Sequence, residues 1–272
     1  MKMKYCCGKP SAVMVAFFLL LFTSCDMFEY SPYEVRLQPE DRKINEQHIA
    51  RIQNLKISPA DTLRVALTAD TQGFYADNDD MVNHLNRRHD VAFVLHGGDI
   101  TDYGLLKEFG WVHRSLKRLA VPYVAVIGNH DAVGNGQQVY KAMFGEFDFT
   151  FSVAGNKFIF LNTNYLEFDQ QAPDLNWLEE QLQDRESYTN VFVVSHIPPN
   201  SPEFGAHNKE RYQHLLKKYN VSLSIHGHTH SYDYYKLEEE GINHLNVAST
   251  DNREYMVMQI VGDKYQLERI HF

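Results

Sequence analysis

The chain has 272 residues, of which 44% are hydrophobic and 22% are charged, a composition typical of a globular protein with a buried core. Acidic residues outnumber basic ones by 35 to 26, so the net charge of -9 disfavours a protein that coats nucleic acid by bulk electrostatic attraction. Three cysteines and 14 histidines exclude a disulfide scaffold and disfavour a thiolate zinc cluster. This composition does not exclude a metal site built from imidazole and carboxylate groups.

Residues 1–24 have the pattern of a bacterial lipoprotein signal peptide. Three lysines precede an apolar run over residues 12–22, which is short for a membrane span and has the length of a signal-peptide core. The following Thr23-Ser24-Cys25 resembles a lipobox, although Phe22 stands where leucine is commonest. We therefore expect a protein of the bacterial cell envelope, anchored to a membrane by lipid on Cys25. The alternative is an uncleaved N-terminal anchor, and both interpretations place the rest of the chain outside the cytoplasm.

Residues 25–60 are expected to form a tether and one N-terminal helix, because apolar side chains recur at helical spacing over residues 44–55. From residue 61 to 272, short apolar runs alternate with amphipathic segments, which predicts one α/β domain. Five strands are expected over residues 63–67, 91–95, 123–127, 191–194 and 221–225. Helices are expected between them over residues 79–88, 105–119, 137–144, 175–182 and 210–219.

Two further groups of strands are predicted. Residues 149–153 and 157–161 flank Ala154-Gly155-Asn156 and are expected to form a hairpin. After residue 230 no helical pattern interrupts the chain, so we expect the last strands to form a second, more antiparallel sheet. These closing strands are predicted over residues 232–237, 242–247, 255–260 and 264–270.

Polar side chains follow each of the first five predicted strands. In chain order they are Asp70-Thr71-Gln72, Gly98-Asp99-Ile100-Thr101-Asp102, Gly128-Asn129-His130-Asp131, Ser195-His196 and His226-Gly227-His228-Thr229-His230. Any one of these aspartates or histidines is ordinarily a helix cap, a turn residue or a surface group. In α/β folds, however, ligands bind where the loops at the carboxyl ends of the strands meet. Their occurrence at five successive strand ends therefore predicts one shared site.

The spacing within these segments favours a metal centre. Gly98 and Gly128 allow the backbone to turn sharply and to approach an ion closely. His228 and His230 are two residues apart, so in extended backbone they project to the same side, and Gly227 clears space beside them. Carboxylate, amide and imidazole ligands without sulfur suit Mn, Fe or Zn ions.

The ordered series of motifs resembles the calcineurin-like metallophosphoesterase family. The motifs are Asp70-x-Gln72, Gly98-Asp99-x-x-Asp102, Gly128-Asn129-His130-Asp131, His196 and Gly227-His228-x-His230. The resemblance extends over about residues 62–272. It implies an α/β fold that is a four-layer αββα sandwich, with two mixed β-sheets flanked by helices and a two-metal centre at one edge of the sheets.

The resemblance also implies which residues hold the two divalent ions. Asp99 would bridge both ions because a carboxylate has two oxygens to share. The first ion would take Asp70 and His230, and the second would take Asn129, His196 and His228. A hydroxide between the ions would attack phosphorus. His130 would protonate the leaving oxygen or stabilise its charge, and Asp102 would orient the imidazole.

Gln72 departs from the family pattern, which has histidine at this position. An amide oxygen is a weaker donor than an imidazole nitrogen, so we expect the first ion to be held less tightly. One interpretation is an asymmetric two-metal centre in which Gln72 is a weak or water-mediated ligand. The alternative is a degenerate site that binds one ion or none.

The remaining histidines receive simpler interpretations. His96 and His226 flank predicted ligands, and a structural role in their strands is favoured over support of the ligands. A contact with substrate is the alternative to a surface position for His207, because His207 lies with nearby Glu203 in the loop after His196. The histidines expected at the surface are His48, His84, His89, His113, His207, His214, His244 and His271.

The sequence thus predicts a metallophosphoesterase that hydrolyses a phosphomonoester or a phosphodiester, either a small molecule or a component of the cell envelope. The alternative is a non-catalytic, lipid-anchored binding protein with a degenerate metal site. A metal-dependent hydrolase of a different bond ranks below both. His130 and Asp102 favour the enzyme, because their expected roles matter only for turnover, whereas Gln72 favours the binding protein.

Overall fold

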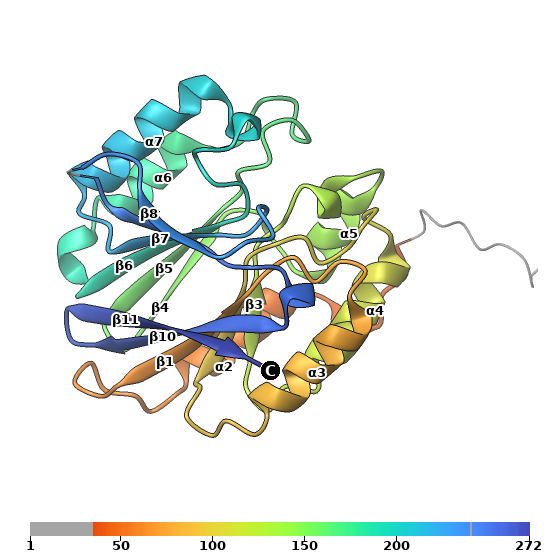
Figure 1. The fold of residues 1–272 in the computed structure, drawn as a ribbon. Coiled ribbons are helices and arrows are strands. Elements are labelled where there is room, and N and C mark those ends of the chain that lie inside the picture. Colours follow the sequence, from red (N-terminus) through yellow and green to blue (C-terminus); the bar gives the residue numbers. More distant parts are fainter. Residues whose placement is uncertain (1–34, 240) are drawn as a thin grey trace, which may run out of the picture. The chain divides into compact units, whose positions relative to one another are not determined.

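The structure is a computed structural model that describes residues 35–239 and 241–272. The predicted signal peptide, Cys25 and the first part of the predicted tether lie outside these described residues. Within the described part of the chain, no helix combines the length and the apolar character needed to cross a membrane. Residues 35–272 form one unit built on two β-sheets (Figure 1). Their buried side chains form three hydrophobic cores.

Both sheets are mixed. In the first, the order is β11-β10-β1-β2-β3, with β1, β2 and β3 parallel, β10 antiparallel to β1, and β11 antiparallel to β10. Its strands are β1 (Leu63–Thr68), β2 (Phe93–His96), β3 (Tyr123–Ala125), β10 (Glu254–Val261) and β11 (Lys264–His271). In the second, the order is β4-β5-β6-β7-β9-β8, with β5, β6, β7 and β9 parallel. Its strands are β4 (Phe149–Val153), β5 (Asn156–Leu161), β6 (Asn190–Ser195), β7 (Leu223–His226), β8 (Asp233–Lys236) and β9 (Asn243–Asn246).

Alternating side chains along the strands create the layers. In β6, Phe192 and Val194 face the core between the sheets, whereas Val191 and Val193 face the outer core under α6 and α7. A matching outer core packs the first sheet against α3, α4 and α5 (Figure 1). These helices are α3 (Tyr75–Leu85), α4 (Leu106–Leu116), α5 (Gly136–Met143), α6 (Leu175–Leu182) and α7 (Ala206–Lys218). The predicted αββα sandwich is confirmed.

The helix α2 (Ile44–Gln53) lies in the amphipathic stretch predicted before the domain, and it packs beside β3 and β4. Asn45 donates to the carbonyl oxygen of Ala125 at 2.9 Å, and its own side-chain oxygen accepts from the amide of Ala125 at 3.0 Å. These bonds satisfy backbone groups at the free edge of β3 and protect that edge from pairing with another chain. Residues before position 60 therefore contribute to the folded unit.

The prediction that the closing strands form a sheet of their own is wrong. β8 and β9 extend the second sheet, whereas β10 and β11 extend the first, with β10 antiparallel to β1. The reason is that β10 is buried on both faces: Met256 and Met258 enter the core between the sheets, while Tyr255 and Val257 enter the outer core. The chain changes sheets through the turn Thr250–Asn252.

Two histidines predicted at the surface are buried. His113 is 6% exposed, and its Nδ1 lies 2.6 Å from the hydroxyl of Tyr123. His244 is 2% exposed and stacks on the rings of His226 and Tyr235. Both lie on faces that other elements cover, which the local sequence pattern does not reveal.

Candidate metal centre

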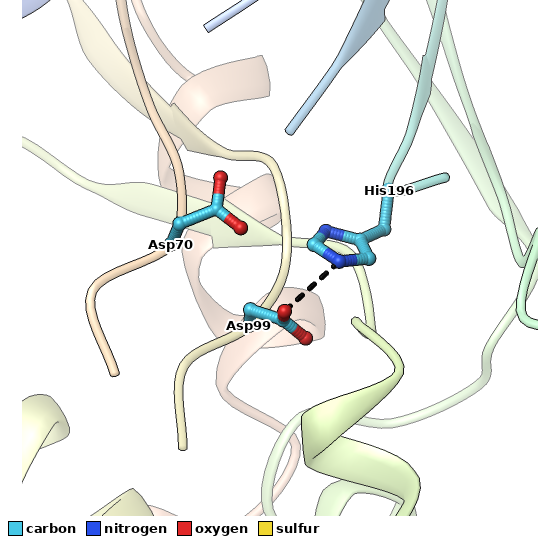
Figure 2. A group of neighbouring side chains, drawn as sticks. All are labelled: Asp70, Asp99 and His196. Carbon is cyan, nitrogen blue, oxygen red and sulfur yellow. Dashed lines mark ion pairs between the residues drawn. The ribbon is translucent and has the colours of Figure 1, made fainter. Parts of the chain in front are cut away.

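Three buried side chains from the ends of three strands converge. Asp70 follows β1 and Asp99 follows β2 in the first sheet, whereas His196 follows β6 in the second. Figure 2 shows these side chains gathered at one point, where ligand atoms from all three lie within 4.8 Å of one another. Oδ2 of Asp99 is 3.1 Å from Nε2 of His196. The two sheets thus meet at a site that neither could build alone.

The orientation of His196 fits a cation. Its Nδ1 lies 2.8 Å from the carbonyl oxygen of Gly97, which can only accept, so the proton is on Nδ1. Its Nε2 faces Oδ2 of Asp99 and Oδ1 of Asn129, the latter at 3.0 Å. Burial lowers the pKa of His196, but the charge and hydrogen bond of Asp99, the charge of Asp70 and the bond to Gly97 together outweigh burial and raise this pKa to about 9. The electrostatic environment of the ring therefore favours positive charge.

Asn129 connects His196 with a second predicted ligand, His228. Oδ1 of Asn129 is 3.1 Å from Nδ1 of His228, and the opposite ring nitrogen of His228 is 3.0 Å from Glu203. A carboxylate on the far nitrogen fixes the orientation of a metal-binding imidazole and raises its basicity. Three of the predicted ligands, Asn129, His196 and His228, therefore direct donor atoms toward one point.

His230 and Gln72 are the other two predicted ligands. Nε2 of His230 is 3.6 Å from Oδ1 of Asp70. Gln72 is buried, and its backbone amide donates to the carbonyl oxygen of Asp99. The side-chain oxygen Oε1 of Gln72 has no hydrogen-bond partner among the described residues. A buried oxygen without a partner is costly, and a cation satisfies such an oxygen. Gln72 therefore fits the role of an oxygen ligand.

The loops hold several of these residues in unusual backbone conformations. Asp70, Asp99, His228 and His230 all have φ between 51° and 71°, which is uncommon for residues other than glycine. The prediction of extended backbone at His228 and His230 is therefore wrong. Left-handed backbone conformations at these two residues determine where the rings lie. Such conformations persist only where the surrounding structure enforces them, and they cluster at functional sites.

Glycines next to the ligands are required by close approach. A Cβ atom at Gly128 would overlap the backbone nitrogen and Oδ1 of Asp99. A Cβ atom at Gly227 would lie 2.8 Å from Oδ2 of Asp70. Both glycines therefore leave space for a carboxylate. The sequence predicts the space at Gly227 beside His228 and His230, and the structure shows that it is needed by Asp70.

His130 lies at the same site, but its contact with Asp102 differs from the expected one. The amide of His130 donates to Oδ1 of Asp99 at 2.9 Å, and its Nδ1 is 3.0 Å from the backbone carbonyl oxygen of Asp102. The Asp102 carboxylate instead lies beside Gly73, where a Cβ atom would be 3.3 Å from Oδ2. The orientation of the His130 ring thus comes from the main chain of Asp102.

Two residues outside the predicted ligand set help to hold the site together. Asp131 is fully buried and accepts from the amides of Thr101 and Gly128, at 2.8 and 2.9 Å, so it ties two of the site loops to each other. Burial raises the pKa of Asp131 to about 7, and the charge of Asp99 acts in the same direction. Glu203, which contacts His228, lies far along the chain in another loop. Asp131 stands inside the Gly128-Asn129-His130-Asp131 motif, whereas the sequence places Glu203 only near His207, in the loop after His196, and does not indicate its contact with His228.

His96 forms hydrogen bonds to the loops that follow β1 and β2. Its Nε2 is 2.9 Å from the hydroxyl of Thr71, and its Nδ1 accepts from the amide of Gly98 at 3.2 Å. Burial lowers the pKa of His96 to about 3, so the ring is neutral and can accept at one nitrogen while donating at the other. The loops after β1 and β2 are therefore joined through one buried imidazole.

Comparison with known proteins agrees with this geometry. The family model described as calcineurin-like phosphoesterase matches residues 63–232. A search of curated proteins found no matching relative. Among solved structures, purple acid phosphatase PPD1 from yellow lupin (Lupinus luteus) aligns with a TM-score of 0.62 at 16% identity and covers 78% of this chain. This chain spans about half of that enzyme, 52% of its length.

Two further solved structures share the fold. GAP50, described as the anchor in the inner membrane complex of Plasmodium, has a TM-score of 0.59 at 17% identity, with 77% of this chain and 84% of that chain covered. PhoD has a TM-score of 0.55 at 11% identity, with 76% of this chain and 65% of that chain covered. At these identities the likeness concerns the fold alone.

Proposed function

Since the chain belongs to the calcineurin-like phosphoesterase family, we propose that it hydrolyses phosphomonoesters or phosphodiesters at a centre of two divalent metal ions. Family membership supports metal-dependent hydrolysis of phosphoesters in general. The observation that carries the proposal is the convergence of Asp70, Asp99 and His196 from both sheets. The substrate is a small molecule or an envelope component that carries a phosphoester.

The donor atoms divide into two sets that share Asp99. One set consists of Asp70, Gln72, Asp99 and His230, and the other of Asp99, Asn129, His196 and His228. These oxygen and nitrogen donors suit Mn, Fe or Zn ions. When bound, such ions supply positive charge that polarises the phosphoryl oxygens and activates the attacking water. Gln72 contributes an uncharged oxygen, so the first set binds its ion more weakly than the second.

His130 is the proposed general acid. Since its Nδ1 is fixed against the carbonyl oxygen of Asp102, its Nε2 is the nitrogen that can give a proton to the leaving oxygen. The bond from the His130 amide to Asp99 keeps the ring next to the ligands. The contribution of Asp102 is to orient this ring.

Hydrolysis of phenyl phosphate and diphenyl phosphate by residues 26–272 in Mn²⁺ tests the proposal, because phenolate is a basic leaving group that gains from a proton. We expect His130→Ala to lower kcat by about 100-fold, the usual contribution of a positioned acid. The matched control is His89→Ala, because His89 is exposed, and this variant retains the parent rate. An unchanged rate in His130→Ala would refute the role of His130.

The alternative function is a non-catalytic binding protein that keeps the sandwich and a degenerate metal site. Gln72 favours it, because the family pattern has histidine there. The Plasmodium structure described as an anchor also favours it, since that protein shares the fold. Failure to hydrolyse either ester with Mn²⁺, Fe²⁺ or Zn²⁺ would favour this alternative over the enzyme.

We further propose that Cys25 carries lipid and anchors the protein to a membrane of the bacterial envelope. The lysines, the apolar run over residues 12–22 and Thr23-Ser24-Cys25 support this proposal. Cys25→Ser is expected to abolish incorporation of a labelled fatty acid, whereas the parent chain is labelled. Labelling that persists in Cys25→Ser would contradict the proposal.

A further inference from the structure

Three large apolar side chains are exposed in the loops around the metal centre. Tyr103 is 65% exposed, Leu166 is 56% exposed and Val133 is 43% exposed. Tyr103 and Val133 lie close in sequence to Asp102 and His130, and Leu166 belongs to the loop after β5. An isolated exposed apolar residue is ordinary, but exposure of several in adjoining loops indicates a binding surface.

Backbone contacts place the three loops side by side. A Cβ atom at Gly104, next to Tyr103, would overlap the carbonyl oxygen of Val133. Nε2 of Gln137, just after the Val133 loop, donates to the carbonyl oxygen of Glu167 at 2.7 Å, and Glu167 follows Leu166. The three loops are thus neighbours, and we name their exposed apolar side chains the apolar rim (Tyr103, Val133 and Leu166).

The apolar rim adjoins the leaving-group side of the site. Nδ1 of His130 contacts the carbonyl oxygen of Asp102, the residue before Tyr103, and the carbonyl oxygen of His130 accepts from the amide of Val133 at 3.4 Å. A leaving group on the oxygen that His130 protonates is therefore next to the loops that carry Tyr103 and Val133. Tyr103 and Val133 lie on the two loops that hold the proposed general acid, and Leu166 lies on the adjacent loop.

The charges around the site do not favour an anionic leaving group. The loops over residues 73–78, 101–105, 132–136, 164–173 and 198–208 contain no lysine or arginine. They do contain Glu167 and Glu203, and Glu203 contacts His228. A leaving group with further phosphates or carboxylates would be repelled by these glutamates, and no lysine or arginine of these loops would compensate the repulsion. An uncharged leaving group avoids that cost.

We propose that Tyr103, Val133 and Leu166 form a subsite for an uncharged, apolar leaving alcohol. The inference rests on the proposed function. In the reaction, the P–O bond to the alcohol breaks, water forms the new P–O bond, and the alcohol departs with the proton from His130. The substrate class is a phosphoester of an alkyl or other hydrocarbon-rich alcohol, such as an amphiphile.

Alkyl phosphates with ethyl and hexyl leaving groups test the subsite, along with methyl ethyl and methyl hexyl phosphodiesters in case the enzyme cleaves diesters. All are soluble, and their leaving alcohols have similar acidity. The protein is residues 26–272 in Mn²⁺, and the released alcohol is measured. We expect kcat/KM to be at least tenfold higher for hexyl than for ethyl, because each methylene removed from water favours binding.

The triple variant Tyr103→Ser, Val133→Ser, Leu166→Ser is expected to reduce the hexyl-to-ethyl ratio of kcat/KM to about twofold or less. The ratio is measured within one variant, so a general loss of activity does not affect it. Val261→Ser is the matched control, because Val261 is 45% exposed and lies at the end of β10, and it retains the parent ratio. The single variant Val133→Ser is expected to give a hexyl-to-ethyl ratio of kcat/KM between those of the parent and the triple variant.

Two results would overturn the subsite. Equal kcat/KM for the ethyl and hexyl esters in the parent, or an unchanged ratio in the triple variant, would overturn the subsite while leaving phosphoester hydrolysis intact. Absence of hydrolysis of every ester would overturn the proposed function, and the subsite with it.

Discussion

Glycines next to the aspartates of the candidate metal centre leave space for the carboxylates, and hydrogen bonds orient these carboxylates. At Gly128, even one additional carbon would overlap the backbone and side chain of Asp99, the carboxylate that the two proposed ligand sets share. In contrast, a Cβ atom at Gly110, within α4, would meet nothing within 4 Å. The same substitution at these two glycines therefore has opposite consequences.

We expect Gly128→Ala to weaken Mn²⁺ binding at least tenfold, because Asp99 must move to admit the methyl group. Gly110→Ala is expected to leave Mn²⁺ binding unchanged and to raise the free energy of unfolding by about 0.5–1 kcal/mol, since alanine restricts the unfolded chain in a helical position. Calorimetric titration and urea unfolding measure both effects. Equal Mn²⁺ affinity in Gly128→Ala and the parent would show that Asp99 is not a ligand.

Some residue contacts of the site follow from sequence and others do not. The positions after the strands indicate that Asp70, Asp99 and His196 meet, because strand ends in α/β folds share an edge. The same pattern does not reveal that Asp102 orients His130 through its main chain, since any residue has a carbonyl oxygen. Nor does it reveal Glu203, because its contact with His228 depends on the path of a loop.

At the scale of elements, the sequence pattern predicts helices and strands best where only one face of the element is buried. The helix Leu175–Leu182 has the predicted bounds, because its apolar spacing is regular and Asp174 caps it. The helix Ala206–Lys218 begins before its predicted start at residue 210, since its first turn is polar and exposed on most sides. The strand Glu254–Val261 is buried on both faces, so its alternation could not show which sheet it joins.

The N-cap of α6 provides a test of this element. Oδ1 of Asp174 accepts from the amides of Asn176 and Trp177, at 3.1 and 2.9 Å. We expect Asp174→Ala to lower the free energy of unfolding by about 1 kcal/mol, because these amides lose their partner. Asp174→Asn retains a capping oxygen and is expected to be close to the parent in urea unfolding. Equal losses in the two variants would assign the effect to charge rather than capping.

At the scale of the whole molecule, a buried carboxyl group makes stability depend on pH. Burial raises the pKa of Asp148 to about 6, while the amide of Asn162 donates to this carboxylate at 2.6 Å and acts in the opposite direction. The folded protein therefore holds a proton that the unfolded chain has already lost between pH 4 and 6. In that window, this group lowers the free energy of unfolding as pH rises.

Asp148→Asn is expected to remove this pH dependence, because asparagine keeps an oxygen for the Asn162 amide and carries no charge. Above pH 6 the variant should be more stable than the parent by about 1–2 kcal/mol, and below pH 4 the two should be equal. Urea unfolding at pH 3.5, 5 and 7.5 measures the difference. A constant difference across these pH values would contradict the account.

The number of Mn²⁺ ions per chain tests the central claim most directly. Equilibrium dialysis of residues 26–272 against saturating Mn²⁺, followed by elemental analysis, is expected to give two ions per chain. Asp99→Asn should give one ion or fewer, because it removes the charge that both ions share. One ion or fewer in the parent chain would contradict the two-metal centre.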